Sequence, residues 1–173
     1  MKKKDSTGIC FIGERPFPEF LNNYIPHDPG IIEDENGSEI GEHKGLAFYT
    51  LGQRQGLGIG GLRHAKNDPW YVAKKNLEKN TLVVVQGNNH PLLMSSQLET
   101  ANLKLVNELD EKRFNGKAKV RYRQEDQDCF IEILDKTLKV KFKEKQRAVT
   151  PGQSVVIYKD DVCLGGGEIN NIL

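Results

Sequence analysis

Residues 116–143 read GKAKVRYRQEDQDCFIEILDKTLKVKFK, and their alternation of polar with apolar side chains decides the fold class. Every second residue of 117–123 is basic, and in 138–143 lysine alternates with leucine, valine and phenylalanine. Successive side chains of a strand point to opposite faces of a sheet, so this spacing predicts half-buried strands. It places one set of side chains outside (Lys117, Lys119, Arg121, Arg123) and the other inside (Ala118, Val120, Tyr122).

Similar short runs fill the C-terminal half of the sequence. Turn residues separate them, and no helical period interrupts them. Many short strands at close spacing predict a small barrel or sandwich. We expect strands at 98–106, 116–124, 128–134, 137–143, 154–158 and 162–169.

The N-terminal half is predicted to be mainly β after one short helix. Apolar residues at helical spacing indicate that helix at 16–25, before Pro26. Two hairpins follow, one centred on Asn36-Gly37 and one pairing 70–73 with 81–85.

The run QGNNHP at 86–91 is the strongest cluster of turn- and loop-forming residues in the chain, and it predicts a domain boundary. We therefore expect three parts. They are a segment of a preceding domain at 1–15, a central β-rich domain at 16–86 and a C-terminal barrel at 87–173.

Composition narrows the classes of protein that the chain can represent. Its 173 residues carry a formal net charge of +1, which argues against a histone-like or tail-like binder but leaves room for a local basic patch. No apolar run reaches the roughly 20 residues needed to span a bilayer, and no secretory signal is recognisable, so we expect a cytoplasmic protein. The histidines and cysteines share no metal-ligand spacing, so no metal site is expected.

The three cysteines form no CxxC pair and no disulfide framework. Cys163 has apolar neighbours, Cys129 lies between Asp128 and Phe130 on a predicted strand, and both are expected in the core. Cys10, in DSTGICFIGER at 5–15, follows a Ser-Thr-Gly turn and has basic residues nearby. Such surroundings lower the pKa of a thiol, whereas a position between Ile9 and Phe11 equally suits a buried, inert cysteine. The residues alone leave both readings open.

Two further features are ambiguous on the residues alone. The basic strand faces suit RNA phosphates, but a solvated sheet face would show the same pattern. The run GLGIGG at 56–61 is not followed by a long amphipathic helix, so it fails as a dinucleotide fingerprint. Its glycines are better suited to tight turns or to close approach of another backbone, and Gln53 and Arg54 are the side chains of interest beside it.

Several longer blocks together resemble one family. They are DSTGICFIGER at 5–15, GEHKGL at 41–46, YTLGQR at 49–54, GLGIGG at 56–61, PWYV at 69–72, RYRQ at 121–124, VTPGQS at 149–154 and CLGGG at 163–167. In this order they resemble the tRNA-specific 2-thiouridylases over nearly the whole chain. The family's N-terminal PP-loop domain and first catalytic cysteine have no counterpart here, so we expect a C-terminal fragment that is inactive alone.

The resemblance implies a fold and a reaction. The fold is a central β-rich domain followed by a six-stranded β-barrel like the second domain of elongation factor Tu. The reaction is 2-thiolation of the wobble uridine in tRNAs for lysine, glutamate and glutamine. ATP with Mg²⁺, bound by the domain absent here, adenylates the base, and a sulfur-donor protein (a cysteine desulfurase or a relay protein) supplies the sulfur.

The same resemblance implies roles for four residues. Cys10 carries a persulfide and forms a transient disulfide with a cysteine of the absent domain, and Arg121, Tyr122 and Gln153 contact tRNA. Two alternatives remain: a non-catalytic RNA-binding barrel with a structural Cys10, and a thiol-redox protein unrelated to RNA. The second is disfavoured by the absence of a CxxC pair.

Overall fold

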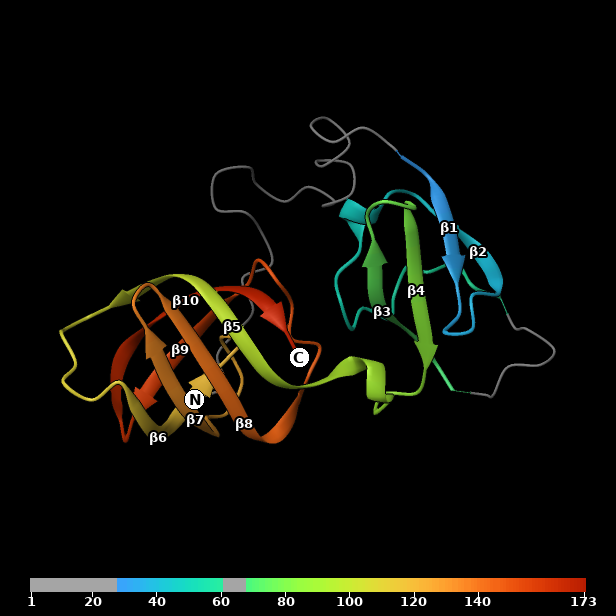
Figure 1. The fold of residues 1–173 in the computed structure, drawn as a ribbon. Coiled ribbons are helices and arrows are strands. Elements are labelled where there is room, and N and C mark those ends of the chain that lie inside the picture. Colours follow the sequence, from blue (N-terminus) through green and yellow to red (C-terminus); the bar gives the residue numbers. More distant parts are fainter. Residues whose placement is uncertain (1–27, 61–67) are drawn as a thin grey trace, which may run out of the picture. The chain divides into compact units, whose positions relative to one another are not determined.

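The structure is a computed structural model that describes residues 28–60 and 68–173. The expected helix at 16–25 and Cys10 lie outside these residues. The chain divides into two compact units, Met1–Gly87 and Asn88–Leu173, which are described separately below (Figure 1). The described residues form strands and short 3-10 turns, so the mainly β fold is confirmed.

The first unit contains a four-stranded sheet in the order β2-β1-β4-β3. Its members are β1 (Gly30–Glu33), β2 (Glu39–His43), β3 (Trp70–Asn76) and β4 (Thr81–Gln86). Both expected hairpins are present as antiparallel pairs, β1 with β2 and β3 with β4, while β1 and β4 run parallel. In the first hairpin the Asp34 carboxylate accepts hydrogen bonds from the amides of Asn36 and Ser38, which explains why the chain turns there.

His43 at the end of β2 fixes the segment that follows it. The imidazole is 1% exposed; its Nε2 lies 3.0 Å from the Asn80 carbonyl oxygen and its Nδ1 accepts the Gly45 amide at 3.0 Å. Because the Gly45 N–H must be the donor to Nδ1, the ring proton resides on Nε2 and is donated to Asn80. The next residues form a 3-10 turn (η1, Leu46–Phe48), and Leu46, Tyr49 and Leu57 pack on the sheet.

The second unit is a closed barrel of six strands in the order β10-β5-β8-β7-β6-β9, as expected. All of its pairs are antiparallel, and a 3-10 turn (η2, Pro91–Leu93) precedes it. The strands are β5 (Met94–Leu105), β6 (Arg113–Lys119), β7 (Gln127–Leu134), β8 (Thr137–Arg147), β9 (Ser154–Lys159) and β10 (Val162–Ile172).

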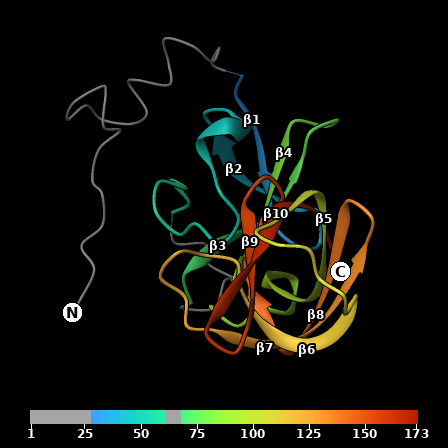
Figure 2. The same ribbon diagram turned by 90° about the vertical axis from the view of Figure 1, so that its left-hand side faces the viewer.

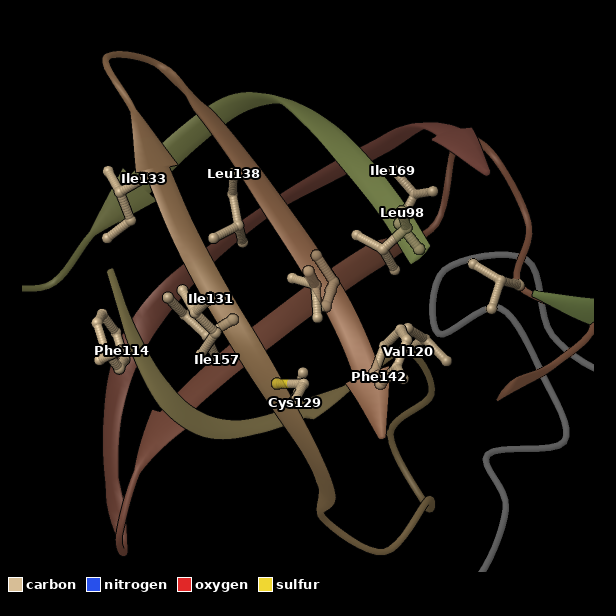
Figure 3. Close-up of a cluster of buried hydrophobic side chains, with 14 residues drawn as sticks. Leu98, Phe114, Val120, Cys129, Ile131, Ile133, Leu138, Phe142, Ile157 and Ile169 are labelled. Atoms are coloured by element: carbon tan, nitrogen blue, oxygen red, sulfur yellow. The ribbon is translucent and has the colours of Figure 1, made fainter. Parts of the chain in front are cut away.

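Every barrel strand contributes buried side chains to the interior, several of which are shown in Figure 3. On β7 the inward side chains are Cys129, Ile131 and Ile133, and on β8 they are Leu138, Val140 and Phe142. Burial of such side chains stabilises each by about 1.5–3 kcal/mol, so the core accounts for closure of the barrel.

Two expectations about individual residues of the barrel are wrong. The strand expected at 116–124 ends at Lys119, so residues 121–123 lie in a turn and do not continue the alternation. Cys163 is exposed rather than in the core, because the register of β10 against β9 shifts between Cys163 and Gly165. The pairing of β10 is irregular along the glycines that follow: Gly165 has φ of 143°, and a Cβ on Gly166 would collide with the Val155 carbonyl.

Candidate functional site

The turn between β6 and β7, residues 120–126, carries two of the predicted site residues. Its backbone closes through the Gln124 amide, which donates to the Arg121 carbonyl at 3.1 Å. The Gln124 side chain closes it again, because its Oε1 accepts the Val120 amide at 3.0 Å. With Val120 buried as the last inward residue, Tyr122 turns outward and is 77% exposed. The strict alternation would have placed this ring inside the barrel.

Arg121 connects this turn to the next one at the same end of the barrel, residues 148–153 between β8 and β9. Its guanidinium donates to the Ala148 carbonyl at 3.2 Å. Ala148 has φ of 51°, in the left-handed region, and its amide donates to the Leu93 carbonyl at 2.7 Å. The contact therefore anchors an exposed arginine on a turn that is itself held from two sides.

Gln153, the third predicted contact, lies in that second turn. Its amide donates to the Thr150 carbonyl at 3.2 Å, and its carbonyl accepts the Ile169 amide at 2.7 Å. Gly152 beside it has φ of 84°, which glycine adopts without strain. The backbone of Gln153 is thus fixed, while its side chain remains partly exposed. The structure brings Arg121, Tyr122 and Gln153 to one end of the barrel, which we call the Tyr122 end.

A chain of glutamine amides supports the Tyr122 end from inside. Gln146 is 4% exposed, and its Oε1 accepts a hydrogen bond from the Gln124 Nε2 at 2.6 Å. The Gln146 Nε2 donates to the Gln127 side chain at 3.1 Å and to the Glu144 carbonyl at 2.7 Å. Buried side-chain amides are stable only when such partners are met, so this network ties the turn at 120–126 to β8. Nothing in the sequence pattern had indicated it, because a glutamine in a strand reads as a solvent-facing residue.

The charges at the Tyr122 end are mixed. Lys119 and Asp126 face each other across the base of the first turn at 2.7 Å, and this hydrogen bond raises the pKa of Lys119. Arg121, Arg123 and Lys145 are exposed, as are Glu125 and Glu144. Because the acidic groups offset part of the positive field, the end is better suited to defined contacts than to unspecific attraction of polyanions.

The described cysteines offer no reactive centre comparable to the role expected of Cys10. Cys129 lies in the core, and burial together with the charge of Asp128 raises its thiol pKa to about 12. Cys163 is free and exposed. Within residues 28–60 and 68–173 there is no cluster of three potential metal ligands. None of the helices in this part of the chain has the length and apolar character to cross a bilayer.

The chain is similar to known proteins along both units. Residues 18–86 match the family model of the tRNA methyl transferase PRC-barrel domain, and residues 95–169 match that of the aminomethyltransferase beta-barrel domain. The tRNA-specific 2-thiouridylase MnmA of Pseudomonas aeruginosa is 58% identical over 169 residues, which is 97% of this chain and 45% of the relative. The proteins of the same name from Marinobacter nauticus and Francisella tularensis subsp. tularensis are 56% and 57% identical over 96% of the chain, and 43% and 47% of their own lengths. The chain therefore spans less than half the length of these relatives.

Proposed function

Because this chain belongs to the tRNA-specific 2-thiouridylase family, we propose that it acts in the 2-thiolation of the wobble uridine of tRNAs for lysine, glutamate and glutamine. The observation that carries this proposal is the identity of 56–58% over at least 96% of the chain, across both structural units. Divergent members of superfolds keep a fold while changing function, so the proposal rests on this extent of identity and not on the barrel fold alone.

In this proposal the Tyr122 end docks tRNA. The exposed Tyr122 ring offers a face on which an unpaired base can stack, and Arg121 offers a cation already oriented by its bond to Ala148. Gln153 adds an amide that can both donate and accept a hydrogen bond. Recognition of RNA by stacking and polar contacts of this kind favours single-stranded regions, and a wobble base lies in such a region.

Cys10 is proposed to carry the sulfur. The persulfide of a donor protein, such as a cysteine desulfurase or a relay protein, transfers its outer sulfur to the Cys10 thiolate, giving Cys10–S–SH and a free donor thiol. Attack of a second thiol on the inner sulfur releases HS⁻ and leaves a disulfide. The released sulfide forms the C2–S bond as the C2–O bond breaks, and the oxygen would leave in the AMP whose adenylyl group came from ATP. A reducing cytoplasm keeps such a disulfide transient, so we place the protein there.

ATP with Mg²⁺ is the activating reagent that the family implies, and the described residues do not fit it. Residues 56–60 are an irregular segment with Gly56 and Gly58 at positive φ, and no α-helix whose N-terminus could hold a phosphate occurs in the described ranges. We therefore assign ATP no site in this part of the chain.

The alternative is a non-catalytic RNA-binding barrel in which Cys10 is structural. It is favoured by the fact that the described residues offer docking groups but no activated nucleophile. The two proposals differ in the fate of sulfur at Cys10, and the experiment below separates them.

The chain is incubated with a cysteine desulfurase and isotopically labelled cysteine, and persulfides are located by mass spectrometry of trapped peptides. The sulfur-carrier proposal predicts labelling of Cys10 that persists in Cys163→Ser and disappears in Cys10→Ser. Label confined to Cys163, or absent from Cys10, would instead favour the structural role.

Docking is tested separately by titrating labelled tRNA with Tyr122→Ala. Loss of a stacked base weakens binding by about 1–3 kcal/mol, or at least about fivefold. Val162→Ala is the control, because Val162 is 62% exposed at the opposite end of the barrel and should bind as the parent does. Equal affinity of the parent and Tyr122→Ala would contradict docking at this end.

A further inference from the structure

An exposed aromatic ring lies on the outer wall of the barrel, away from the Tyr122 end. Phe130 on β7 points outward and is 43% exposed, between the inward residues Cys129 and Ile131. Its cross-strand neighbours are Asn115 on β6 and Lys141 on β8, and the three strands lie side by side in the wall (Figure 2). Directly opposed side chains on paired strands are about 5 Å apart, so an amide and an ammonium group flank the ring.

The basic residues of this wall differ in whether an acidic side chain forms an ion pair with them. Arg113 pairs with Glu132, Lys119 with Asp126 at 2.7 Å and Lys139 with Glu99 at 2.7 Å. Around Phe130 the pairing is weaker: Lys143 lies 3.9 Å from Asp128, and neither Lys117 nor Lys141 makes an ion pair with any residue of the described ranges. Asp128 is the cross-strand partner of Lys117, so the three lysines beside the ring face two carboxylates, Asp128 and Asp160, and leave a small net positive charge there.

The surface here is hollowed rather than flat. An open concavity of about 600 Å³ is lined by polar and aromatic side chains, among them Asn115, Lys117, Asp128, Phe130, Lys141, Lys143 and Asp160. The carboxylates of an acidic peptide would pair with the lysines, but such a peptide gives no reason for the exposed aromatic ring of Phe130. A nucleotide satisfies both, because its base stacks on an aromatic ring and its phosphates pair with lysine.

We propose that this wall, the Phe130 site, binds a nucleotide of single-stranded RNA, with the base stacked on Phe130 and the adjoining phosphates at Lys117 and Lys141. The Asn115 amide can donate to or accept from the base edge. Phe130 lies four residues, or about 13 Å, along the chain from the end of the turn that bears Tyr122. The site thus extends the docking surface of the Tyr122 end along the barrel wall, and in this respect it rests on the proposed function.

The test uses the chain and a fluorescent oligouridylate of about 12 nucleotides, within the range of 4–16 seen for single-strand sites. An abasic oligomer of equal length is the second probe, since it keeps the phosphates and removes the bases. Phe130→Ala should bind oligouridylate at least about fivefold more weakly and bind the abasic oligomer as the parent does. Leu134→Ala is the matched control, because Leu134 lies outward on the same strand and is 40% exposed; it should bind both probes normally.

The lysines are tested by salt dependence. Each phosphate contact to a single strand contributes about 0.7 to the slope of log K against log salt concentration, so Lys117→Gln with Lys141→Gln should lower the slope by about 1.4. Lys104→Gln with Lys136→Gln removes the same charge elsewhere on the barrel and should leave the slope nearly unchanged. An equal slope loss in both double variants would overturn the assignment.

Other outcomes separate the Phe130 site from the proposed function. If Tyr122→Ala weakens tRNA binding while Phe130→Ala binds oligouridylate normally, the Phe130 site is refuted and docking at the Tyr122 end stands. Displacement of oligouridylate from the parent by polyglutamate, with no effect of Phe130→Ala, would assign the wall to an acidic protein instead. If the parent binds neither tRNA nor oligouridylate, both proposals fail.

Discussion

Replacing Gln146 with leucine should destabilise the barrel and loosen the turn that carries Arg121 and Tyr122. Gln146 is 4% exposed and makes three hydrogen bonds, to Gln124, to Gln127 and to the Glu144 carbonyl. Leucine fills a similar volume but removes the hydrogen-bond partner of the Gln124 and Gln127 side chains and of the Glu144 carbonyl. At about 1 kcal/mol for each lost bond, the free energy of unfolding should fall by about 3 kcal/mol.

The barrel can be followed alone through the methyl resonances of Ile131 and Ile157, both fully buried in it, during a urea titration. Gln97→Leu is the control: Gln97 is exposed on β5 and should change stability by less than about 0.5 kcal/mol. Gln146→Leu should also weaken tRNA binding in urea-free buffer, because Gln124 loses the partner that positions it against Val120. A stability change no larger than that of Gln97→Leu would refute the network as a structural support.

Three further results are expected. Burial raises the pKa of the Cys129 thiol from 9.0 to about 12 in the folded state. The protonated thiol therefore contributes fully to stability below pH 9, and this contribution is lost as the pH rises toward 12. In urea titrations the parent should lose about 2 kcal/mol more than Cys129→Val between neutral pH and about pH 10.5. His43→Ala removes both imidazole hydrogen bonds and should lower the stability of the first unit by at least about 2 kcal/mol, measured by fluorescence of Trp70, the only tryptophan; an unchanged urea midpoint would contradict this. Gly166→Ala places a Cβ against the Val155 carbonyl and should lower barrel stability by at least about 1 kcal/mol, seen at the Ile157 methyl, whereas an unaffected barrel would show that β9 and β10 can separate at the bulge.

The sequence pattern predicted strands well where one face is buried along the whole element. At 128–134 and 137–143 the period of two continues without interruption, so apolar residues alone specify which face is inside. The closing pairs β6–β9 and β5–β10 join residues distant in sequence, and only the family resemblance implied a six-stranded barrel.

The errors share a physical cause, which is a local interruption of the alternation. Beyond Lys119 the turn at 120–126 contains no glycine or proline, and it closes through the Gln124 side chain instead of a recognisable turn sequence. At Cys163 a bulge shifts the register, so its apolar neighbours say nothing about its own exposure. The outward position of Phe130 could have been predicted from the sequence, because the alternate residues Cys129, Ile131 and Ile133 face the interior of the barrel.

We have proposed that this chain carries sulfur on Cys10 to a tRNA docked at the Tyr122 end. The most direct measurement replaces the matching C-terminal part of the Pseudomonas aeruginosa relative with this chain and quantifies 2-thiouridine in tRNA from a strain lacking its own 2-thiouridylase. We expect the hybrid to restore 2-thiouridine. Cys10→Ser should abolish it while tRNA binding is retained, and Tyr122→Ala should lower it through weaker binding. Normal 2-thiouridine in the Cys10→Ser hybrid would contradict the account.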